Sequence, residues 1–558
     1  MSVASPSKPE FRVLKNPIDG QALKQLVEAS LNWLRTNQQT VNALNVFPVP
    51  DGDTGTNMVL TMQAANDEIS KSPDHNVGKM AHSVAHGALM GARGNSGVIL
   101  SQLWRGFARA LDNQECIDGP SLVKAFEQAR DTAYKGVVRP VEGTILTVAR
   151  DIATAASAAL LETDDPIDIL EKIVPAADLS VQHTPDLLPV LKEAGVVDSG
   201  GKGLFFILEG MVRYIHGQPL DKAVAYVQPL SAMKIENSLE AIEPGQDFEV
   251  VVDFRPAMPL DILAFYESLE KMGTSIQVGE GDGIYRMHIH VPTERRYLPI
   301  DYTMTLGTIT KVAIENLQAQ MQDLEDLQGG SKFSLALPEP GQIAVVTVSP
   351  GSGISRVFAS LGAAAIVEGG QTMNPSTQEI IQSFENLPTD RVIILPNNKN
   401  IIMAANSASM LTVKKVGVIP TKTIPQGMAA MLRLEPDGDF DEVLKEMTGA
   451  IDEVESGEIT QATRSVEIDG VSVNEGEYIA LLNDKLVVAG SNLDDVCLNF
   501  LEKAHADHFE LITLFSGANL PKKEVVRIAD LIRAHYPNQE VEVQDGGQPH
   551  YYFIISIE

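Results

Sequence analysis

Apolar side chains recur every three to four positions along roughly the first 215 residues, which is the spacing of an amphipathic helix. Between Gly20 and Asn37, for example, the apolar residues fall on one face of a helix. The same spacing predicts further helices over 58–70, 79–90, 121–136 and 145–160, one from 98 onward, two within 166–191, and one that runs through 210–214. This part of the chain is therefore predicted to be all-helical, with its glycine-rich and acidic segments between the helices.

Beyond Gly217 the apolar pattern becomes strand-like. A small α+β module is predicted first, with strands over 248–254, 285–291 and 308–316, helices near 259–272 and 299–304, and a turn at 279–283. The polar stretch Gln318–Lys332 then predicts a linker. From Gln342 strands and helices alternate, which predicts a doubly wound α/β fold with strands over 343–348, 364–367, 391–395 and 416–419, later units at 478–482 and 511–515, and an edge strand at 551–557.

A chain of 558 residues is too long for one hydrophobic core, so several domains are expected. We predict a disordered tail over 1–16, a helical domain over 17–216, an α+β domain over 217–330 and an α/β domain over 331–558.

The net charge of −31 argues against nucleic-acid binding, and any anionic substrate needs a local cationic pocket. Two distant cysteines, no leader-like start and no apolar run of about 18 residues predict a cytoplasmic protein without an integral membrane segment.

The segment Asn45–Met58, NVFPVPDGDTGTNM, concentrates turn formers and oxygen-bearing side chains. Asp51 and Asp53 lie two residues apart, and Thr54, Thr56 and Asn57 follow them. Mg²⁺ takes oxygen ligands and usually shares them with substrate phosphates, so the segment predicts a cation site. The alternative is a surface Asp-Gly turn that caps a helix.

A second glycine-rich stretch, Gly87–Phe107, leads into a helix. Backbone N–H groups at Gly94, Asn95 and Ser96, with the positive end of that helix, suit a phosphate, and Arg93 can supply positive charge. Close helix packing through glycine is the alternative. The stretch Gly195–Gly203 is not a P-loop, because Gly201 occupies the lysine position, but Asp198 remains in a polar helix start.

The chain resembles the bacterial fatty acid kinase A family. The matching stretches are NVFPVPDGDTGTNM, GALMGARGNSGVILSQ, PVEGTIL, GVVDSGGKG, VEGGQTMNPST and ILPNNKNI. The resemblance implies an antiparallel helical barrel like the ATP-binding subunit of dihydroxyacetone kinase, a middle domain that forms a homodimer, and a DegV-like C-terminal domain. It implies ATP and Mg²⁺ as cofactors. It also implies a separate fatty-acid-loaded DegV-type protein as partner, whose acyl carboxylate is phosphorylated to give acyl phosphate and ADP.

Carried onto this sequence, the resemblance assigns the cation to Asp51 and Asp53, with Asn45 at the first ligand position. Dihydroxyacetone kinases carry Asp at that first position and His where this chain has Thr54, so both departures favour the fatty acid kinase branch. The remaining assignments are phosphate binding by Gly94, Asn95 and Ser96, assistance by Thr56 and Asn57, and a nucleotide pocket lined by Gly143, Thr144 and Asp198.

Some relatives also carry a Cys beside histidines that match His288 and His290. This chain has Val251 there and no evident third ligand, so a cross-strand polar pair is favoured over zinc.

Two other functions compete with a fatty acid kinase. One is a kinase for dihydroxyacetone (glycerone) or another small polyol, which would need a partner that holds the ketone on a histidine. The other is a non-catalytic regulatory protein that responds to ATP and lipid. The intact acidic and glycine-rich segments count against the second, since a sensor has no need of metal ligands.

Overall fold

The computed structural model describes residues 12–14, 17–45, 52–220, 227–229, 247–258, 260–281, 284–316, 335–468 and 470–558. Asp51, the predicted linker 318–332 and all of the predicted tail except 12–14 lie outside these residues. The chain forms two compact units. Unit 1 comprises 1–222, 334–462 and 466–558, and unit 2 comprises 223–333 and 463–465.

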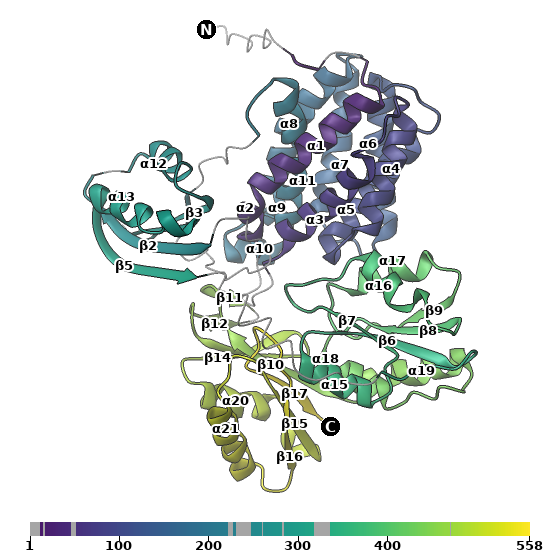
Figure 1. Cartoon of the computed structure of the whole chain (residues 1–558), viewed down its shortest axis with the longest axis vertical. Helices are drawn as coiled ribbons and strands as arrows, with labels where there is room; N and C mark the ends of the chain where they lie inside the picture. The colour runs from purple at the N-terminus through teal and green to yellow at the C-terminus, as the bar shows by residue number, and fades with distance from the viewer. Residues whose placement is uncertain are drawn as a thin grey trace. The chain divides into compact units, whose positions relative to one another are not determined.

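The first part of unit 1 is helical, as the apolar spacing predicts (Figure 1). Its helices are α1 (Gly20–Thr36), α2 (Gln38–Asn42), α3 (Thr54–Ile69), α4 (Val77–Met90), α5 (Gly94–Ala110), α6 (Gly119–Gly136), α7 (Ile145–Leu160), α8 (Pro166–Gln182), α9 (Thr184–Leu187), α10 (Pro189–Ala194) and α11 (Ser199–Ile215). Each long helix packs against the next in the order α1, α3, α4, α5, α6, α7, α8, α11, and α11 packs against α1. Among the described helices, none has both the length and the apolar run that crossing a membrane requires.

The apolar faces of these helices share one core in which Trp33, Leu34 and Met58 are completely buried. Inside it lies a cavity of about 70 Å³ whose lining includes Leu26, Trp104 and Phe107. The cavity lining is apolar, and none of the predicted site residues belongs to it. The predicted site residues lie instead at the ends of the helices.

Unit 2 contains a five-stranded sheet in the order β1-β3-β4-β2-β5. The sequence pattern did not predict β3, because its glycine-containing end looks like a turn. Phe254 and Phe265 pack together in the core at a ring distance of 5.6 Å. The elements are β1 (Val227–Pro229), β2 (Phe248–Pro256), α12 (Ile262–Leu269), β3 (Thr274–Gly281), β4 (Ile284–Val291), α13 (Leu298–Leu306) and β5 (Gly307–Asn316).

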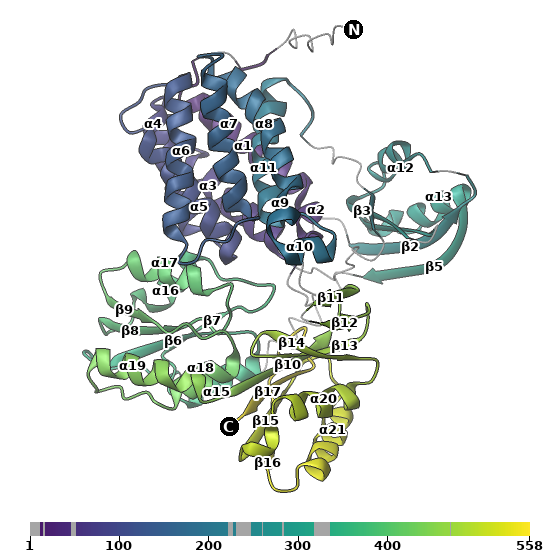
Figure 2. The ribbon, with the colours of Figure 1, turned by 180° about the vertical axis from the view of Figure 1, so that it is seen from behind.

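The second part of unit 1 begins with a four-stranded parallel sheet in the order β7-β6-β8-β9. Helices α16 and α17 cover one face, and α15, α18 and α19 cover the other (Figure 2). All seven residues of β6 are buried, as expected of a strand covered on both faces. The elements are β6 (Ile343–Ser349), α15 (Ser352–Ser360), β7 (Ala365–Glu368), α16 (Thr377–Glu385), β8 (Arg391–Leu395), α17 (Ile402–Met410), β9 (Lys415–Val418), α18 (Ile424–Met431) and α19 (Phe440–Gly449).

A second sheet of six strands follows, in the order β14-β13-β10-β17-β15-β16. It mixes antiparallel and parallel pairs, so the predicted doubly wound pattern holds for the first sheet only. The prediction of an edge strand at the C-terminus is wrong, because β17 lies between β10 and β15 and all of its residues are buried. The elements are β10 (Glu455–Gln461), β11 (Val466–Ile468), β12 (Val471–Val473), β13 (Tyr478–Leu482), β14 (Lys485–Gly490), α20 (Leu493–Lys503), β15 (Leu511–Ser516), α21 (Lys522–His535), β16 (Glu540–Asp545) and β17 (Phe553–Ile557).

Candidate functional site

Asp53 occupies the N-cap position of α3, yet its side chain makes no capping hydrogen bond. Asn42, at the end of α2, caps the helix instead. Its Oδ1 accepts hydrogen bonds from the backbone N–H groups of Gly55 at 2.7 Å and Thr56 at 3.2 Å. The Asp53 carboxylate is thereby released from the role that an N-cap aspartate usually has. Asp53 is also only 8% exposed, so the surface-turn alternative does not describe this residue.

Two other predicted residues lie beside the start of α3. The hydroxyl of Thr54 donates to Oδ1 of Asn45 at 2.7 Å, and the hydroxyl of Ser199, at the start of α11, donates to Thr54 at 3.3 Å. The Thr56 hydroxyl instead faces α2, where it accepts from Gln38 at 2.9 Å. The sequence grouped Thr54 and Thr56 together, but the structure turns their side chains to different neighbours.

The start of α5 lies against α3. Gly94 has a left-handed φ of +56°, and a Cβ there would lie 2.4 Å from Nδ2 of Asn57. Glycine is required for both reasons, the backbone angle and the close approach. A helix start exposes backbone N–H groups that have no partner within the helix, and in α5 these belong to Gly94, Asn95 and Ser96.

Asp198 joins the starts of two more helices. It is the N-cap of α11, where its carboxylate accepts from the N–H of Gly201 at 2.6 Å, and it also accepts from the N–H of Ile145, the first residue of α7. Burial raises the pKa of Asp198 to about 6, against the opposing effect of these two N–H groups. Gly143, with φ +83°, sits against Thr184, whose hydroxyl accepts from the N–H of Asp198 at 3.0 Å. The predicted pocket residues at 143–144 and 198 therefore lie together.

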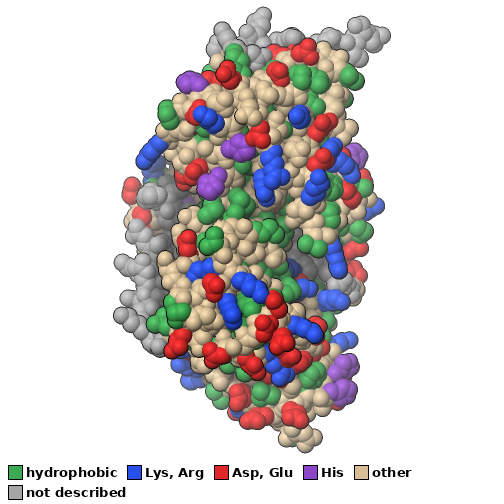
Figure 3. Space-filling view, turned by 90° about the vertical axis from the view of Figure 1, so that its right-hand side faces the viewer, with side chains coloured by type: hydrophobic (Ala, Val, Ile, Leu, Met, Phe, Trp, Pro, Cys, Tyr) green, Lys and Arg blue, Asp and Glu red, His purple; other side chains and the backbone are tan. Residues whose placement is uncertain are grey.

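The starts of α3, α5, α7 and α11 thus meet at one end of the helical part. The short helices α2, α9 and α10 lie at the same end (Figures 1 and 2). Each helix start carries a partial positive charge, so four of them concentrate positive potential at this end of the helical part. The chain carries a net charge of −31, so an anionic substrate needs local positive potential of this kind. On the face drawn in Figure 3, Lys and Arg side chains are interspersed with Asp and Glu.

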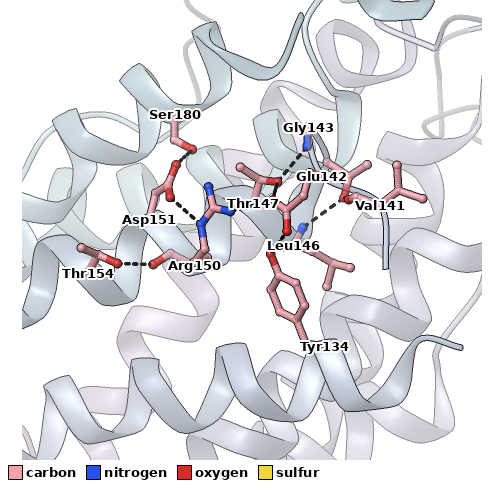
Figure 4. Close-up of polar contacts among 11 residues, drawn as sticks. Tyr134, Val141, Glu142, Gly143, Leu146, Thr147, Arg150, Asp151, Thr154 and Ser180 are labelled. Carbon is pink, nitrogen blue, oxygen red and sulfur yellow. Dashed lines mark hydrogen bonds and ion pairs between the residues drawn. The ribbon is translucent and has the colours of Figure 1, made fainter. Parts of the chain in front are cut away.

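A polar network around Glu142 fixes the turn before α7 (Figure 4). The Glu142 carboxylate accepts from the hydroxyls of Thr147 at 2.6 Å and Tyr134 at 3.0 Å, and from Arg150 at 2.7 Å. The Thr147 hydroxyl bond contributes most to lowering the pKa of Glu142, while burial and this carboxylate raise the pKa of Tyr134 to about 12. Glu142 was not among the predicted site residues, although the PVEGT break in the helical pattern marks its position.

The second part of unit 1 also reaches the candidate site. Arg93 donates to the backbone carbonyl of Asn374 at 2.9 Å and forms an ion pair with Glu379 at 3.0 Å. The Asn374 side chain donates from Nδ2 to Oδ2 of Asp53. Arg93 was predicted to supply positive charge, and the structure shows that an acidic partner already balances that charge. No spacing in the sequence signals Asn374, because 321 positions separate it from Asp53.

The donor atoms around Asp53 suit a hard cation. Asn45, Asp53 and Thr54 offer carboxylate, amide and hydroxyl oxygens, which are the ligands that Mg²⁺ prefers. Asn374 adds a buried amide oxygen that has no hydrogen-bond partner within the described part of the chain. Asp51 lies outside the described residues, so its predicted role stays a prediction.

Unit 2 holds a separate group of possible metal ligands. Donor atoms of Glu249, His288 and His290 all lie within 4.8 Å of one another, and the three residues are buried. The His288 Nδ1 lies 3.1 Å from the carbonyl oxygen of Ser275, which can only accept, so in the neutral ring Nδ1 carries the proton and Nε2 carries a lone pair. That Nε2 lies 2.8 Å from the Glu249 carboxylate. The sequence shows no third donor for the two histidines, because only the strand pairing brings Glu249 opposite His290.

Three family models match this chain: a DAK2 domain over 48–213, and the FakA-like middle and C-terminal domains of fatty acid kinases over 243–324 and 344–558. An uncharacterized protein of Staphylococcus aureus strain MRSA252 is 37% identical over 548 residues, which are 97% of this chain and 99% of that protein. The chain belongs to the fatty acid kinase A family. An uncharacterized protein of Staphylococcus saprophyticus is 36% identical over 97% of this chain and 99% of its own length.

Two solved structures are similar to parts of this chain. A dihydroxyacetone kinase from C. freundii in complex with AMP-PNP and Mg²⁺ has 19% identity and a TM-score of 0.29, over 38% of this chain and 37% of that one. DegV, a fatty acid binding protein from Bacillus subtilis, has 13% identity and a TM-score of 0.30, over 39% of this chain and 99% of that one. Membership in the fatty acid kinase A family makes the chain a phosphotransferase of the kinase type.

Proposed function

We propose that this protein is an ATP-dependent kinase that phosphorylates the carboxylate of a fatty acid presented by a separate DegV-type binding protein. The main support is the position of the Asp53 carboxylate, at the point where four helix starts meet. Asn42 caps α3 in its place, so Asp53 makes no capping hydrogen bond. This point falls within the DAK2 match of a chain from the fatty acid kinase A family. A nucleoside triphosphate with its Mg²⁺ requires helix starts that bind phosphate beside a carboxylate that binds the cation.

In this proposal Asp51, Asp53 and Asn45 hold Mg²⁺, and Thr54 and Asn57 support the site. The backbone N–H groups of Gly94, Asn95 and Ser96 bind phosphate oxygens, and Thr56 keeps α3 in place through its bond to α2. The nucleotide pocket continues to Gly143, Thr144 and Asp198 at the starts of α7 and α11. When bound, Mg²⁺ neutralises charge on the phosphates.

The reaction requires positioning more than covalent chemistry from the protein. A fatty acid carboxylate is already a nucleophile, so one of its oxygens forms a bond to the γ-phosphorus while the bond from that phosphorus to the β-phosphate oxygen breaks. Acyl phosphate and ADP leave, and no proton needs to be moved. The absence of a catalytic base among the predicted residues fits such a reaction, in which electrostatic stabilisation and orientation supply most of the rate enhancement.

The proposal extends to the assembly of the protein. The helical part would form an antiparallel barrel, and unit 2 would join two copies into a homodimer. Strand β5 lies at an edge of the unit 2 sheet, where unpaired backbone groups can accept another strand. Apolar side chains are exposed on α13 and β5, namely Met304 at 63% and Val312 at 41%. In the proposed homodimer these two side chains would lie in the contact between the copies.

The function is tested by following ADP release from Mg²⁺ATP with two acceptors in parallel. One reaction receives a DegV-type protein loaded with fatty acid, and the other receives dihydroxyacetone. We expect stimulation only by the loaded binding protein. Stimulation by dihydroxyacetone alone would select the polyol kinase, and nucleotide binding without turnover under both conditions would select a regulatory protein.

A further inference from the structure

Asn374 belongs to the loop after β7, far from Asp53 in sequence but in contact with it. Its side chain is 2% exposed, and its Nδ2 donates to Oδ2 of Asp53. An ionised carboxylate only accepts hydrogen bonds, so the amide must present its N–H to Asp53 and direct its carbonyl oxygen elsewhere. The orientation of the Asn374 amide is therefore fixed by its partner and not by an arbitrary choice between nitrogen and oxygen.

The carbonyl oxygen of Asn374 is left without a partner. Oδ1 is buried and has no hydrogen-bond partner among the described residues. Buried polar atoms are nearly always paired, and an exception beside a candidate cation ligand indicates a group that arrives with the ligand. Asn374 also lies close to the start of α5. A Cβ built at Gly94 would lie 2.4 Å from Nδ2 of Asn57 and 3.7 Å from Nδ2 of Asn374.

The loop is held on the helical part by several other contacts. Arg93 bonds the carbonyl of Asn374 and the carboxylate of Glu379, and the N–H of Thr377 donates to the carbonyl of Ala92 at 3.2 Å. The side chains of Ala92 and Val98 are buried in the same apolar cluster as α16 and α17. Glu379 is itself fixed, since its second oxygen accepts from the N–H of Ser376 at 2.6 Å in the cap of α16. The contact is a packed interface and not one isolated hydrogen bond.

We propose that Asn374 is a positioning residue of the kinase site, which orients the Asp53 carboxylate and offers Oδ1 to the divalent cation or to a water bound to it. This inference rests on the proposed function, because Asp53 is the cation ligand there. Hydrogen-bond partners of metal-ligating carboxylates fix the ligand's orientation. The kinase site is then built from both parts of unit 1, and the helical part alone lacks one of its groups.

The test measures binding of Mn²⁺, as a spectroscopic substitute for Mg²⁺, to the full-length protein by electron paramagnetic resonance. Asn374→Ala removes both polar atoms, and Asn374→Leu removes them while keeping the side-chain volume. Met373→Ala is the matched control, because Met373 is the neighbouring residue on the same loop and is 47% exposed. We expect Asn374→Ala and Asn374→Leu to bind Mn²⁺ about tenfold more weakly, with Met373→Ala unchanged.

A thermal melting curve of each variant separates this role from simple fastening of the loop. Lower thermal stability with an unchanged Mn²⁺ affinity in both Asn374 variants would overturn the inference, and so would tighter Mn²⁺ binding, since Asn374 would then compete with the cation. Asp53→Ala separates the role of Asn374 from the cation site itself. If it loses Mn²⁺ while the Asn374 variants retain it, only the inference fails. If the wild-type protein binds no Mn²⁺, the proposed cation site fails as well.

Discussion

At the scale of single residues, the candidate site depends on an exchange of roles between Asn42 and Asp53. A helix start must satisfy several backbone N–H groups, and an aspartate at the N-cap normally does so. Here Asn42 accepts two of those bonds, which leaves the Asp53 carboxylate to face Asn374. A neutral residue on a different helix therefore caps α3 in place of Asp53.

Substitution Asn42→Ala is expected to destabilise the start of α3. Loss of an N-cap acceptor costs about 1 kcal/mol, and the Asn42 amide also donates to Thr56 at 3.1 Å. A drop of about 2–4 °C in the melting temperature of the helical part follows. Differential scanning calorimetry measures it, with Asn538→Ala as a control at an exposed position. Equal melting temperatures for both variants would show that Asn42 does not cap α3.

A second residue-scale prediction concerns Glu249, His288 and His290. Burial lowers the pKa of His290 to about 4, so this imidazole is neutral at physiological pH and can offer a lone pair to a metal ion. Two imidazoles and a carboxylate are a donor set that binds Zn²⁺. Protein dialysed against zinc should retain about one zinc per chain by mass spectrometry, and His290→Ala should retain none. Equal zinc in both would contradict the site.

At the scale of elements, hydrophobic spacing predicted the long helices, since each has one apolar face toward a shared core. It missed β3, whose glycines resemble a turn. It predicted β17 as a strand but placed it at the edge of the sheet, because its two neighbouring strands are distant in sequence. The motifs likewise predicted a common location for Asp53 and Gly94, and the structure brings the starts of α3 and α5 together. Asn374 and Glu249 were missed because only tertiary packing brings a lone Asn or Glu to its partner.

Strand β10 gives a prediction on pH. Burial, and then the negative charge of Asp484, raise the pKa of Glu458 from its ordinary value to about 7, with Lys399 opposing the shift. The folded protein therefore holds a proton that the unfolded chain releases near pH 4.5, so ionisation of Glu458 destabilises the fold as pH rises from about 4.5 to 7. We expect Glu458→Gln to flatten the fall in melting temperature between pH 5 and about pH 8.

The control for the pH experiment is Glu446→Gln, which changes an exposed glutamate on α19. Its melting temperature should follow the wild-type protein at every pH. A Glu458→Gln variant with the same pH dependence as the wild-type protein would show that Glu458 does not carry a raised pKa.

At the scale of the whole molecule, the homodimer proposal depends on unit 2. Val312→Asp places a charge on the exposed face of edge strand β5, where it would be buried in a dimer contact. We expect size-exclusion chromatography with light scattering to show dimers of the wild-type protein and monomers of Val312→Asp. Val413→Asp, which alters an exposed valine after α17, is the matched control and should remain dimeric. A monomeric wild-type protein would exclude the homodimer.

In the proposed function this chain transfers the γ-phosphoryl group of ATP to a fatty acid carboxylate. The most direct measurement is the appearance of acyl phosphate itself, trapped by hydroxylamine as the hydroxamate, in a reaction with Mg²⁺ATP and a fatty-acid-loaded DegV-type protein. We expect hydroxamate in equal amount to ADP, and none from Asp53→Ala, whose fold is checked by its melting curve. ADP release without hydroxamate, or undiminished hydroxamate from Asp53→Ala, would contradict it.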